Sequence, residues 1–126
     1  MANDDHVARL RQGAEAWNAW RREHPEVEPD LRGSHLRGID LSRADLAASD
    51  LSRADLRGTI LRSARLRGAR LEGANLFKAV LDDADLEDAV LTGAQFLNCA
   101  QLVVARNWQS AKRDPALACG ASIPGA

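Results

Sequence analysis

Residues 41–60 read LSRADLAASDLSRADLRGTI, and a leucine stands at every fifth position of this stretch. The same spacing runs without a break from Leu31 to Leu91, thirteen leucines in all, and Phe96 holds the fourteenth position. A period of five matches neither the alternation of a half-buried strand nor the 3.6-residue turn of a helix. A short, strict repeat of this kind indicates a solenoid, in which each unit buries its apolar side chains against its neighbours.

The repeat also separates inward from outward positions. The residue two places before the leucine is small in almost every unit, and it is alanine in seven consecutive units from Ala64 to Ala94. We expect this residue and the leucine to face inward, because the other three positions carry nearly all the charge. Glycine recurs two places after the leucine, where the chain has to turn, at Gly33, Gly38, Gly58, Gly68, Gly73 and Gly93.

Units such as Ser42-Arg43-Ala44-Asp45-Leu46 and Glu72-Gly73-Ala74-Asn75-Leu76 resemble the A-(D/N)-L-x-x motif of the pentapeptide repeat proteins. The resemblance covers residues 29–98 and implies an all-β solenoid of that family's kind, a right-handed quadrilateral β-helix with four repeats per 20-residue coil. Fourteen repeats would then make about 3.5 coils. The position before the leucine departs from Asp or Asn in several units, which weakens any inference of a uniformly acidic rod.

The chain reads as a single domain with three segments. Residues 1–28 predict one capping α-helix with a short exit, which begins after Asn3 or Asp4 and ends at His24-Pro25. Residues 29–98 are the repeats, and residues 99–126 predict a short helical cap and a tail. A solenoid must cover its terminal coils, so we expect the tryptophans to act as capping residues: Trp17 and Trp20 at one end and Trp108 at the other.

The two cysteines do not by themselves define a disulfide framework. Cys99 stands where the repeat places a small inward residue, so a buried free thiol is the favoured interpretation. A disulfide to Cys119 is the alternative if the tail folds back over the last coil, and spacing alone does not decide between the two.

A 20-residue coil places residue i beneath residue i+20, which makes specific predictions about charge. Arginines are concentrated between residues 57 and 70, and acids between residues 82 and 88. We expect pairs of opposite charge one coil apart to help fix the register, although each exposed pair adds little stability. The predicted inter-coil ion pairs are Arg62 with Asp82, Arg65 with Asp85, and Arg67 with Glu87.

One side of the rod is a candidate docking patch. Aromatic residues and arginine are enriched at protein interfaces, and the register expected for the coils places an exposed Phe in a row with arginines. The alternative is that a terminal segment covers these residues. The candidate patch consists of Arg37, Arg57, Phe77, Lys78 and Leu97, with Ile60 and Val80 as an adjacent apolar column.

Composition and motifs argue against several function classes. The chain has 17 basic and 18 acidic residues and a net charge of -1, which favours neither a nucleic-acid binder nor a strongly acidic mimic. The histidines lack metal-ligand spacing, and neither a phosphate loop nor a nucleophile motif is present. We therefore predict no enzymatic activity, no cofactor, no metal, no direct nucleic-acid binding and no membrane insertion. The acidic N-terminus favours a cytoplasmic location over a secreted one.

The leading functional hypothesis is a rigid, non-enzymatic scaffold or protein-interaction module that presents the side faces of a β-helix to a partner. The resemblance also implies an alternative, because a subgroup of the family imitates duplex DNA and binds type II topoisomerases. Such a mimic needs a long negative rod, whereas this chain is short and has an arginine band. A structural domain of a larger assembly is a third interpretation, and a homodimer is left open.

Overall fold

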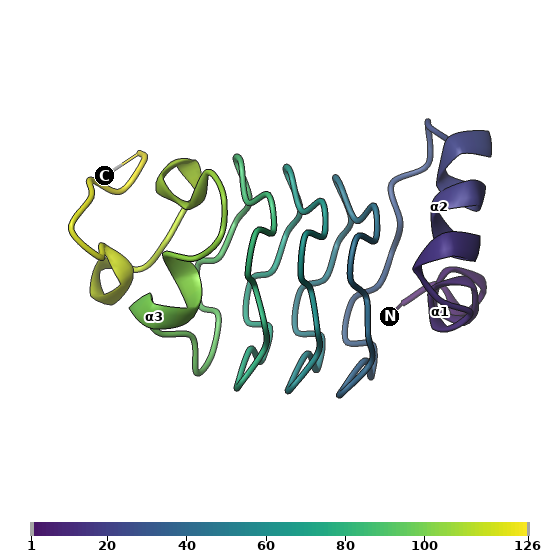
Figure 1. The fold of residues 1–126 in the computed structure, drawn as a ribbon, viewed down its shortest axis with the longest axis horizontal. Helices are drawn as coiled ribbons and strands as arrows, with labels where there is room; N and C mark the ends of the chain where they lie inside the picture. Colours follow the sequence, from purple (N-terminus) through teal and green to yellow (C-terminus); the bar gives the residue numbers. More distant parts are fainter. Residues whose placement is uncertain (1, 126) are drawn as a thin grey trace.

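The fold is a rod of stacked coils with helical segments at both ends, as seen in a computed structural model that describes residues 2–125. Figure 1 shows α1 (Asp4–Arg11) and α2 (Ala14–Glu23) packed at the N-terminal end. At the other end lie α3 (Cys99–Leu102) and two short 3-10 helices, η1 (Trp108–Ser110) and η2 (Pro115–Leu117). The coils between them place the two termini at opposite ends of the rod.

The coils are joined by a parallel ladder that pairs residue i with residue i+20. Single bridges join Asp30 to Asp50, Arg65 to Asp85, and Asn75 to Gln95. Almost every leucine of the repeats donates its N–H to a carbonyl of the next coil, as Leu46 does to Arg65 at 2.8 Å. Each rung is so short that the described chain has bridges but no continuous strand. Four repeats, one on each side, therefore complete one coil.

The core is a column of leucines faced by small residues. The thirteen leucines from Leu31 to Leu91 are each at most 1% exposed. Alanines two places before them are buried as well, and Ser49 and Thr59 are 0% exposed at the same position. The Thr59 hydroxyl donates to the Leu36 carbonyl at 2.7 Å, which satisfies the hydroxyl inside the rod. Because leucines and small residues fill the interior, the search for a functional site turns to the side chains on the surface.

Each corner of the coil is built by two local devices. The residue before the leucine, when it is Asp or Asn, accepts the backbone N–H two residues later, as Asp50 does from Ser52 at 3.0 Å. The second corner residue then adopts a positive φ, such as 65° at Gly58, which glycine tolerates without strain. The repeat motif thus prescribes the bend as well as the core.

The N-terminal segment forms two helices, so the prediction of one helix over residues 1–28 is wrong in this respect. Asn3 caps α1 by accepting the N–H groups of Asp5 and His6, and the chain bends at Gly13, whose φ is 106°. The bend lets both helices lie across the end of the rod. Trp17 is 0% exposed and Trp20 is 9% exposed beneath them.

Side chains of α2 complete the hydrogen bonds of the first coil. The Asn18 amide donates to the Arg43 carbonyl at 2.9 Å and accepts the N–H of Asp45 at 2.7 Å. The Trp17 indole donates to the Asp45 carbonyl at 2.7 Å. Asn18 thereby satisfies a donor and an acceptor that a preceding coil would otherwise have satisfied. The N-terminal edge of the ladder is closed along this side.

The C-terminal end continues the ladder with extra residues. Bridges pair Asp85 with Arg106 and Val90 with Lys112, so the step of the ladder grows by one residue and then by another. Leu102 is 0% exposed and takes a place in the core. Phe96, in contrast, is 66% exposed, so the expectation that it fills a fourteenth core position is wrong.

A disulfide and one buried cation hold the C-terminal segment together. Cys99 and Cys119 are joined by a disulfide, which corrects the expectation of a free thiol at Cys99. The reason is that α3 begins at Cys99 and takes it out of the repeat, while the tail folds back toward it. Arg113 is 4% exposed and donates to five backbone carbonyls, those of Gln109, Ala111, Leu117, Ala118 and Ser122.

Candidate interaction face

The exposed apolar side chains gather on one side of the rod. Among the described residues, the large hydrophobic side chains that are exposed are Phe77 (47%), Phe96 (66%), Val103 (44%) and Val104 (43%). They flank the side that bears the half-buried Ile60 and Val80, which pair with each other in the ladder. We refer to these six residues as the apolar face.

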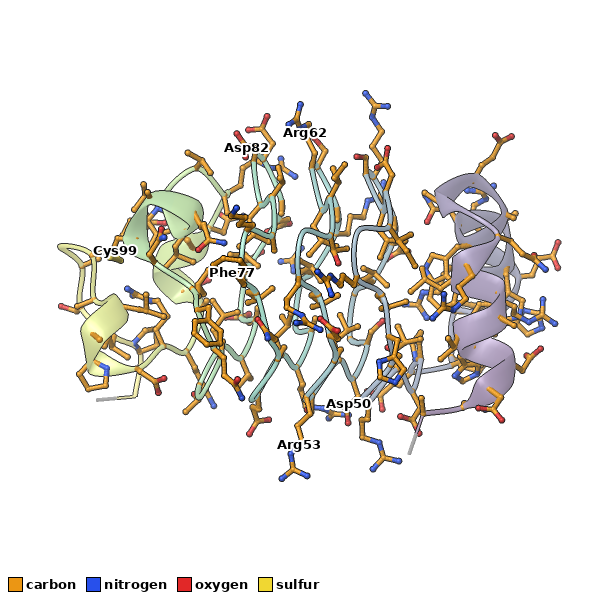
Figure 2. The ribbon with its side chains drawn as sticks, turned by 90° about the horizontal axis from the view of Figure 1, so that it is seen from below. Asp50, Arg53, Arg62, Phe77, Asp82 and Cys99 are labelled. Carbon is orange, nitrogen blue, oxygen red and sulfur yellow. A yellow bond between two sulfur atoms is a disulfide. The ribbon has the colours of Figure 1, made fainter. Side chains whose placement is uncertain are left out.

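Two corners bound the apolar face. The Phe77 corner consists of residues 37–38, 57–58 and 77–78, and the Asp82 corner consists of residues 42–43, 62–63 and 82–83. Figure 2 shows Phe77 and Asp82 on the same coil at these neighbouring corners, with Arg62 on the adjacent coil beside Asp82. Val104 belongs above the Asp82 corner, because its carbonyl accepts the N–H of Asp83 at 3.0 Å.

Aromatic and cationic groups meet at the Phe77 corner. The rings of Phe77 and Phe96 are 6.0 Å apart between centroids and nearly perpendicular, at 78°. This edge-to-face geometry is favourable for aromatic pairs. The Lys78 ammonium lies 5.4 Å from the centre of the Phe77 ring, within range of a cation–π contact. The two rings and the cation form an exposed cluster.

The predicted patch residues differ in their exposure and in their partners. Phe77 and Lys78 are exposed, and Ile60 and Val80 are half-buried beside them. Arg57 is held by Asp55 at 2.7 Å, so its cation is neutralised within its own corner. Arg37 is exposed, and its positive charge helps to lower the pKa of the Asp55 carboxyl.

Leu97 lies on the opposite side of the chain from its predicted place. It packs against the core, and Phe96 is outside in its stead. The reason is local, because Phe96 has a φ of 58°, and this positive φ comes two residues before the corner that the repeat would place at residue 98. The apolar face therefore gains Phe96 where the row of Arg37, Arg57 and Phe77 predicted Leu97.

The sequence-based prediction of the patch missed Val103 and Val104. The structure places them after α3, whose N-terminus is fixed by a capping box between Asn98 and Gln101. The Gln101 amide also donates to the carbonyls of Leu76 and Ala79, which ties α3 to the coil below. The spacing Asn-x-x-Gln was the available signal for this helix start. It would have shown that the valines follow a helix and leave the repeat register.

The predicted inter-coil ion pairs form only in part. Arg67 contacts Glu87 at 2.6 Å, whereas no ion pair joins Arg62 to Asp82 or Arg65 to Asp85 within residues 2–125. Arg65 and Asp85 are bridged in the backbone ladder, so the register is as expected while the side chains diverge. Asp85 instead accepts from the Asn107 amide at 2.9 Å, and Arg62 acts electrostatically on Asp40.

The aspartates before the leucines are engaged in the corners. The Arg57 side chain, donating to Asp55, lowers the pKa of that carboxyl to about 2 from its ordinary 3.8. Hydrogen bonds from Ser42 likewise lower the pKa of Asp40. At Asp50 burial raises the pKa, but hydrogen bonds from Ser52 and the charge of Arg70 at 3.4 Å outweigh it and the net shift is downward. These acids act mainly in folding the corners, a role that the sequence interpretation missed.

The predicted capping residues lie at the ends of the rod. Trp17 and Trp20 are buried under the N-terminal helices. Trp108 is half-buried, and the Arg113 guanidinium stacks 5.0 Å from the centre of its ring. The three tryptophans therefore contact the terminal segments and lie away from the apolar face.

An open groove of about 1060 Å³ lies between α1 and the first coils, where Arg11 donates to the His35 carbonyl. Its charged residues are of mixed sign and include Asp4, Arg53 and Glu72. The described residues contain no group of three potential metal-binding side chains. No helix within residues 2–125 has the length and apolarity that a membrane crossing requires.

The repeat segment of the chain matches a known protein family. The family model for pentapeptide repeats matches residues 30–62, 61–93 and 69–100, with 8 copies. No curated protein is significantly similar to the chain. The segments matched by the family model together cover more than half of the chain.

Several solved structures are similar in sequence. A pentapeptide repeat protein from the Arabidopsis thaliana thylakoid lumen is 30% identical over 75% of this chain and 61% of that chain, with a TM-score of 0.44. One from the cyanobacterium Cyanothece 51142 is 31% identical over 66% of this chain and 55% of that chain, with a TM-score of 0.33. One from Nostoc PCC 7120 is 33% identical over 79% and 76%, with a TM-score of 0.34.

The chain thus spans 61% and 55% of the first two of these structures. The family match rests on the five-residue repeat, which is also the period of the corners and of the leucine core. The chain therefore belongs to the pentapeptide repeat family, whose members are right-handed β-helices and are generally non-enzymatic.

Proposed function

We propose that this chain is a non-enzymatic protein-interaction module: a β-helical rod of about 3.5 coils, capped by helical segments, that binds protein through its apolar face. The observation that carries the proposal is the gathering of Phe77, Phe96, Val103 and Val104 around one side of the rod. Exposed apolar clusters with charged margins are typical of docking surfaces. A rigid core beneath the face supports this use, because few side chains need to be ordered on binding.

The topoisomerase-binding alternative has less support. A DNA mimic needs acids that are free to replace phosphates, whereas Asp50 and Asp55 bind arginines and corner amides. The arginine band from Arg57 to Arg70 adds positive charge to the middle coils. A role as a structural domain of a larger assembly stays compatible with the same face.

The location of the chain bears on which partners it meets. A cytoplasmic location stays a prediction from the N-terminal sequence. The Cys99–Cys119 bond is relevant to it, because disulfides persist mainly in oxidising compartments. Binding partners should therefore be sought under both oxidising and reducing conditions.

Site-specific photo-crosslinking tests the proposal. A photoreactive phenylalanine analogue replaces Phe77 in one protein and the exposed Thr92, outside the apolar face, in a control. We expect discrete protein adducts from position 77 only, and the mass of each adduct distinguishes a second copy of the chain from another protein. The Phe96→Asp variant should reduce the yield at position 77. Equal adducts at both positions, or none at either, would contradict the proposal.

A further inference from the structure

A histidine of α1 completes the backbone ladder at the start of the first coil. In the higher coils, the residue before the leucine donates its N–H to a carbonyl of the coil below, as Asp50 does to Pro29 at 2.9 Å. Asp30 has no coil below it. Its N–H donates instead to the Nδ1 atom of His6 at 3.0 Å, and its carbonyl accepts the N–H of Asn3 at 2.9 Å. The His6 imidazole therefore takes the place of a carbonyl in the ladder.

This hydrogen bond requires one protonation state of the imidazole. A backbone N–H can only donate, so Nδ1 of His6 must carry a lone pair and the proton of the neutral ring must be on Nε2. Protonation places a hydrogen on Nδ1 as well, and the N–H of Asp30 then faces a second donor. An amide that loses its acceptor away from bulk water costs free energy. Asn18 accepts the N–H of Asp45 at 2.7 Å on another side of the coil, but its amide does not titrate.

Basic groups already surround the indole next to His6. The rings of His6 and Trp20 are 5.2 Å apart between centroids. The Arg9 guanidinium lies 5.2 Å from the centre of the same indole, and the His24 ring stacks on it at 5.3 Å. His24 donates from Nδ1 to the Trp20 carbonyl at 3.1 Å, a bond that both protonation states of His24 can make. A charge on His6 would thus be added beside one cation and a second titratable ring.

The acids on the neighbouring elements are already paired. Asp5 of α1 binds Arg9 at 2.9 Å, and Asp30 of the first coil binds Arg32 at 2.8 Å. The hydrogen bond from Arg32 lowers the pKa of the Asp30 carboxyl, although burial opposes this shift. Within residues 2–125, no ion pair joins His6 to a carboxylate. These acids therefore offer a protonated His6 little compensation for the lost bond to Asp30.

We propose that His6 is a pH-sensitive switch, which holds α1 on the first coil when it is neutral and releases α1 when it is protonated. The inference concerns the N-terminal end of the rod and does not depend on the apolar face. Two other polar contacts attach α1 to the coil: the bond from Asn3 to Asp30 and the bond from the Arg11 guanidinium to the His35 carbonyl. Because α1 forms one wall of the open groove beside the first coils, its release widens that groove.

The direction of the pH effect follows from the acceptor. Histidine changes its charge between about pH 8 and pH 5. The bond between Asp30 and His6 exists only with the neutral ring, so it is present at the upper end of this range and is lost as the pH falls. The carboxyl of Asp55, whose pKa is lowered to about 2, titrates far below this range. Release of α1 is therefore separable from acid effects on the coils.

Amide hydrogen exchange measured by NMR at about pH 7.5 and pH 5.5 tests the inference, with each rate expressed as a protection factor so that the intrinsic pH dependence cancels. In the wild type we expect the protection of the Asp30 amide and of α1 to fall at least about fivefold at the lower pH, while Leu46 is unchanged. In His6→Asn, the Oδ1 atom can accept the same N–H without titrating, so protection should not depend on pH. This variant keeps the α-amino group, which titrates in the same range. His24→Gln is the matched control and should keep the wild-type response.

The tautomer of His6 provides a second readout on the wild type alone. Long-range proton–nitrogen correlation spectra at about pH 7.5 should show the His6 proton on Nε2 and a bare Nδ1. A proton on Nδ1, or wild-type protection that is the same at both pH values, overturns the inference whether or not His6→Asn folds. An equal loss of protection in a folded His6→Asn overturns it as well. Crosslinking at position 77 is a separate measurement, so any of these results leaves the proposed function standing.

Discussion

The two ends of the rod are closed by different means. At the N-terminal end, α2 lays Trp17 and Asn18 on the first coil, and their side chains bond its free backbone groups. At the C-terminal end, the ladder itself continues to Lys112, and the tail is fixed by the Cys99–Cys119 bond and by Arg113. Each end contains a buried arginine, since Arg21 of α2 donates to the Ala47 carbonyl of the first coil at 2.8 Å, but only the C-terminal end adds a covalent bond.

This difference indicates that the ends should respond to different conditions. The N-terminal closure consists of apolar burial and hydrogen bonds, including those of the buried Arg21, and a reductant does not affect them. The C-terminal closure includes a bond that a reductant breaks. Because the apolar face includes Phe96 and the valines beside α3, changes at the C-terminal end should also reach the proposed binding surface.

The largest effect is expected from truncating the N-terminal anchor. Trp17→Ala removes a side chain that is 0% exposed and an indole hydrogen bond, and should lower the free energy of unfolding by about 4 kcal/mol. Trp108→Ala, at a half-buried position of the other end, should cost clearly less. Urea unfolding followed by circular dichroism measures both. Equal losses would show that the ends are not closed differently.

Breaking the disulfide should have the next largest effect, and a local one. The bond joins cysteines at a sequence separation of 20, and its loss in Cys99→Ser/Cys119→Ser should cost about 3 kcal/mol. Hydrogen exchange should accelerate over residues 99–125 and stay slow at the rungs near Leu46. Acceleration along the whole rod would contradict the separate closure of the C-terminal end.

Asn18→Ala tests the hydrogen-bonded closure of the first coil. The variant leaves the Asp45 N–H and the Arg43 carbonyl without the amide that pairs them, which should cost about 1–2 kcal/mol. The exposed Glu15 on the same helix provides the control, since Glu15→Ala should be nearly neutral. Faster exchange of the Asp45 amide in Asn18→Ala would locate the effect, and unchanged exchange would count against this role.

The smallest effect is expected at acid pH, and it should arise in the coils that both ends enclose. Because Arg57 lowers the pKa of folded Asp55 to about 2 from 3.8, the carboxyl stabilises the fold fully above about pH 3.8. This contribution is lost as the pH falls toward 2. Asp55→Asn keeps an acceptor for the corner, so its melting temperature should fall less between pH 4 and about pH 2.5. A parallel fall in both proteins would refute this assignment.

The body of the fold follows from the repeat because one residue type decides each position. The period places Leu46 and its equivalents inward, the family resemblance implies four repeats per coil, and the rung between Arg65 and Asp85 has this register. Side-chain directions were less predictable. Arg62 and Asp82 lie one above the other at the same corner, but the flexible Arg62 side chain can take rotamers that do not reach the Asp82 carboxylate. Register is set by the backbone, whereas exposed ion pairs are weak.

Only part of the apolar face could be predicted from the sequence. Phe77 and Val80 stay in the repeat, so the five-residue period located them. Phe96 and Val103 lie where the period ends: Phe96 is exposed at a backbone reversal, and Val103 follows α3. The Cys99–Cys119 pairing depends on the path of the tail, which no local pattern describes.

The stepwise lengthening of the ladder near the C-terminal end, at the rungs of Arg106 and Lys112, shows where the rod tolerates change. The extra residues there leave the backbone bonds of Arg106 and Lys112 to the coil below intact. In the body, one added residue would turn every later leucine toward water, whereas a whole added coil would leave all of them in place. Such a rod can evolve in length by duplication of whole 20-residue coils, which would leave the helical segments at both ends unchanged.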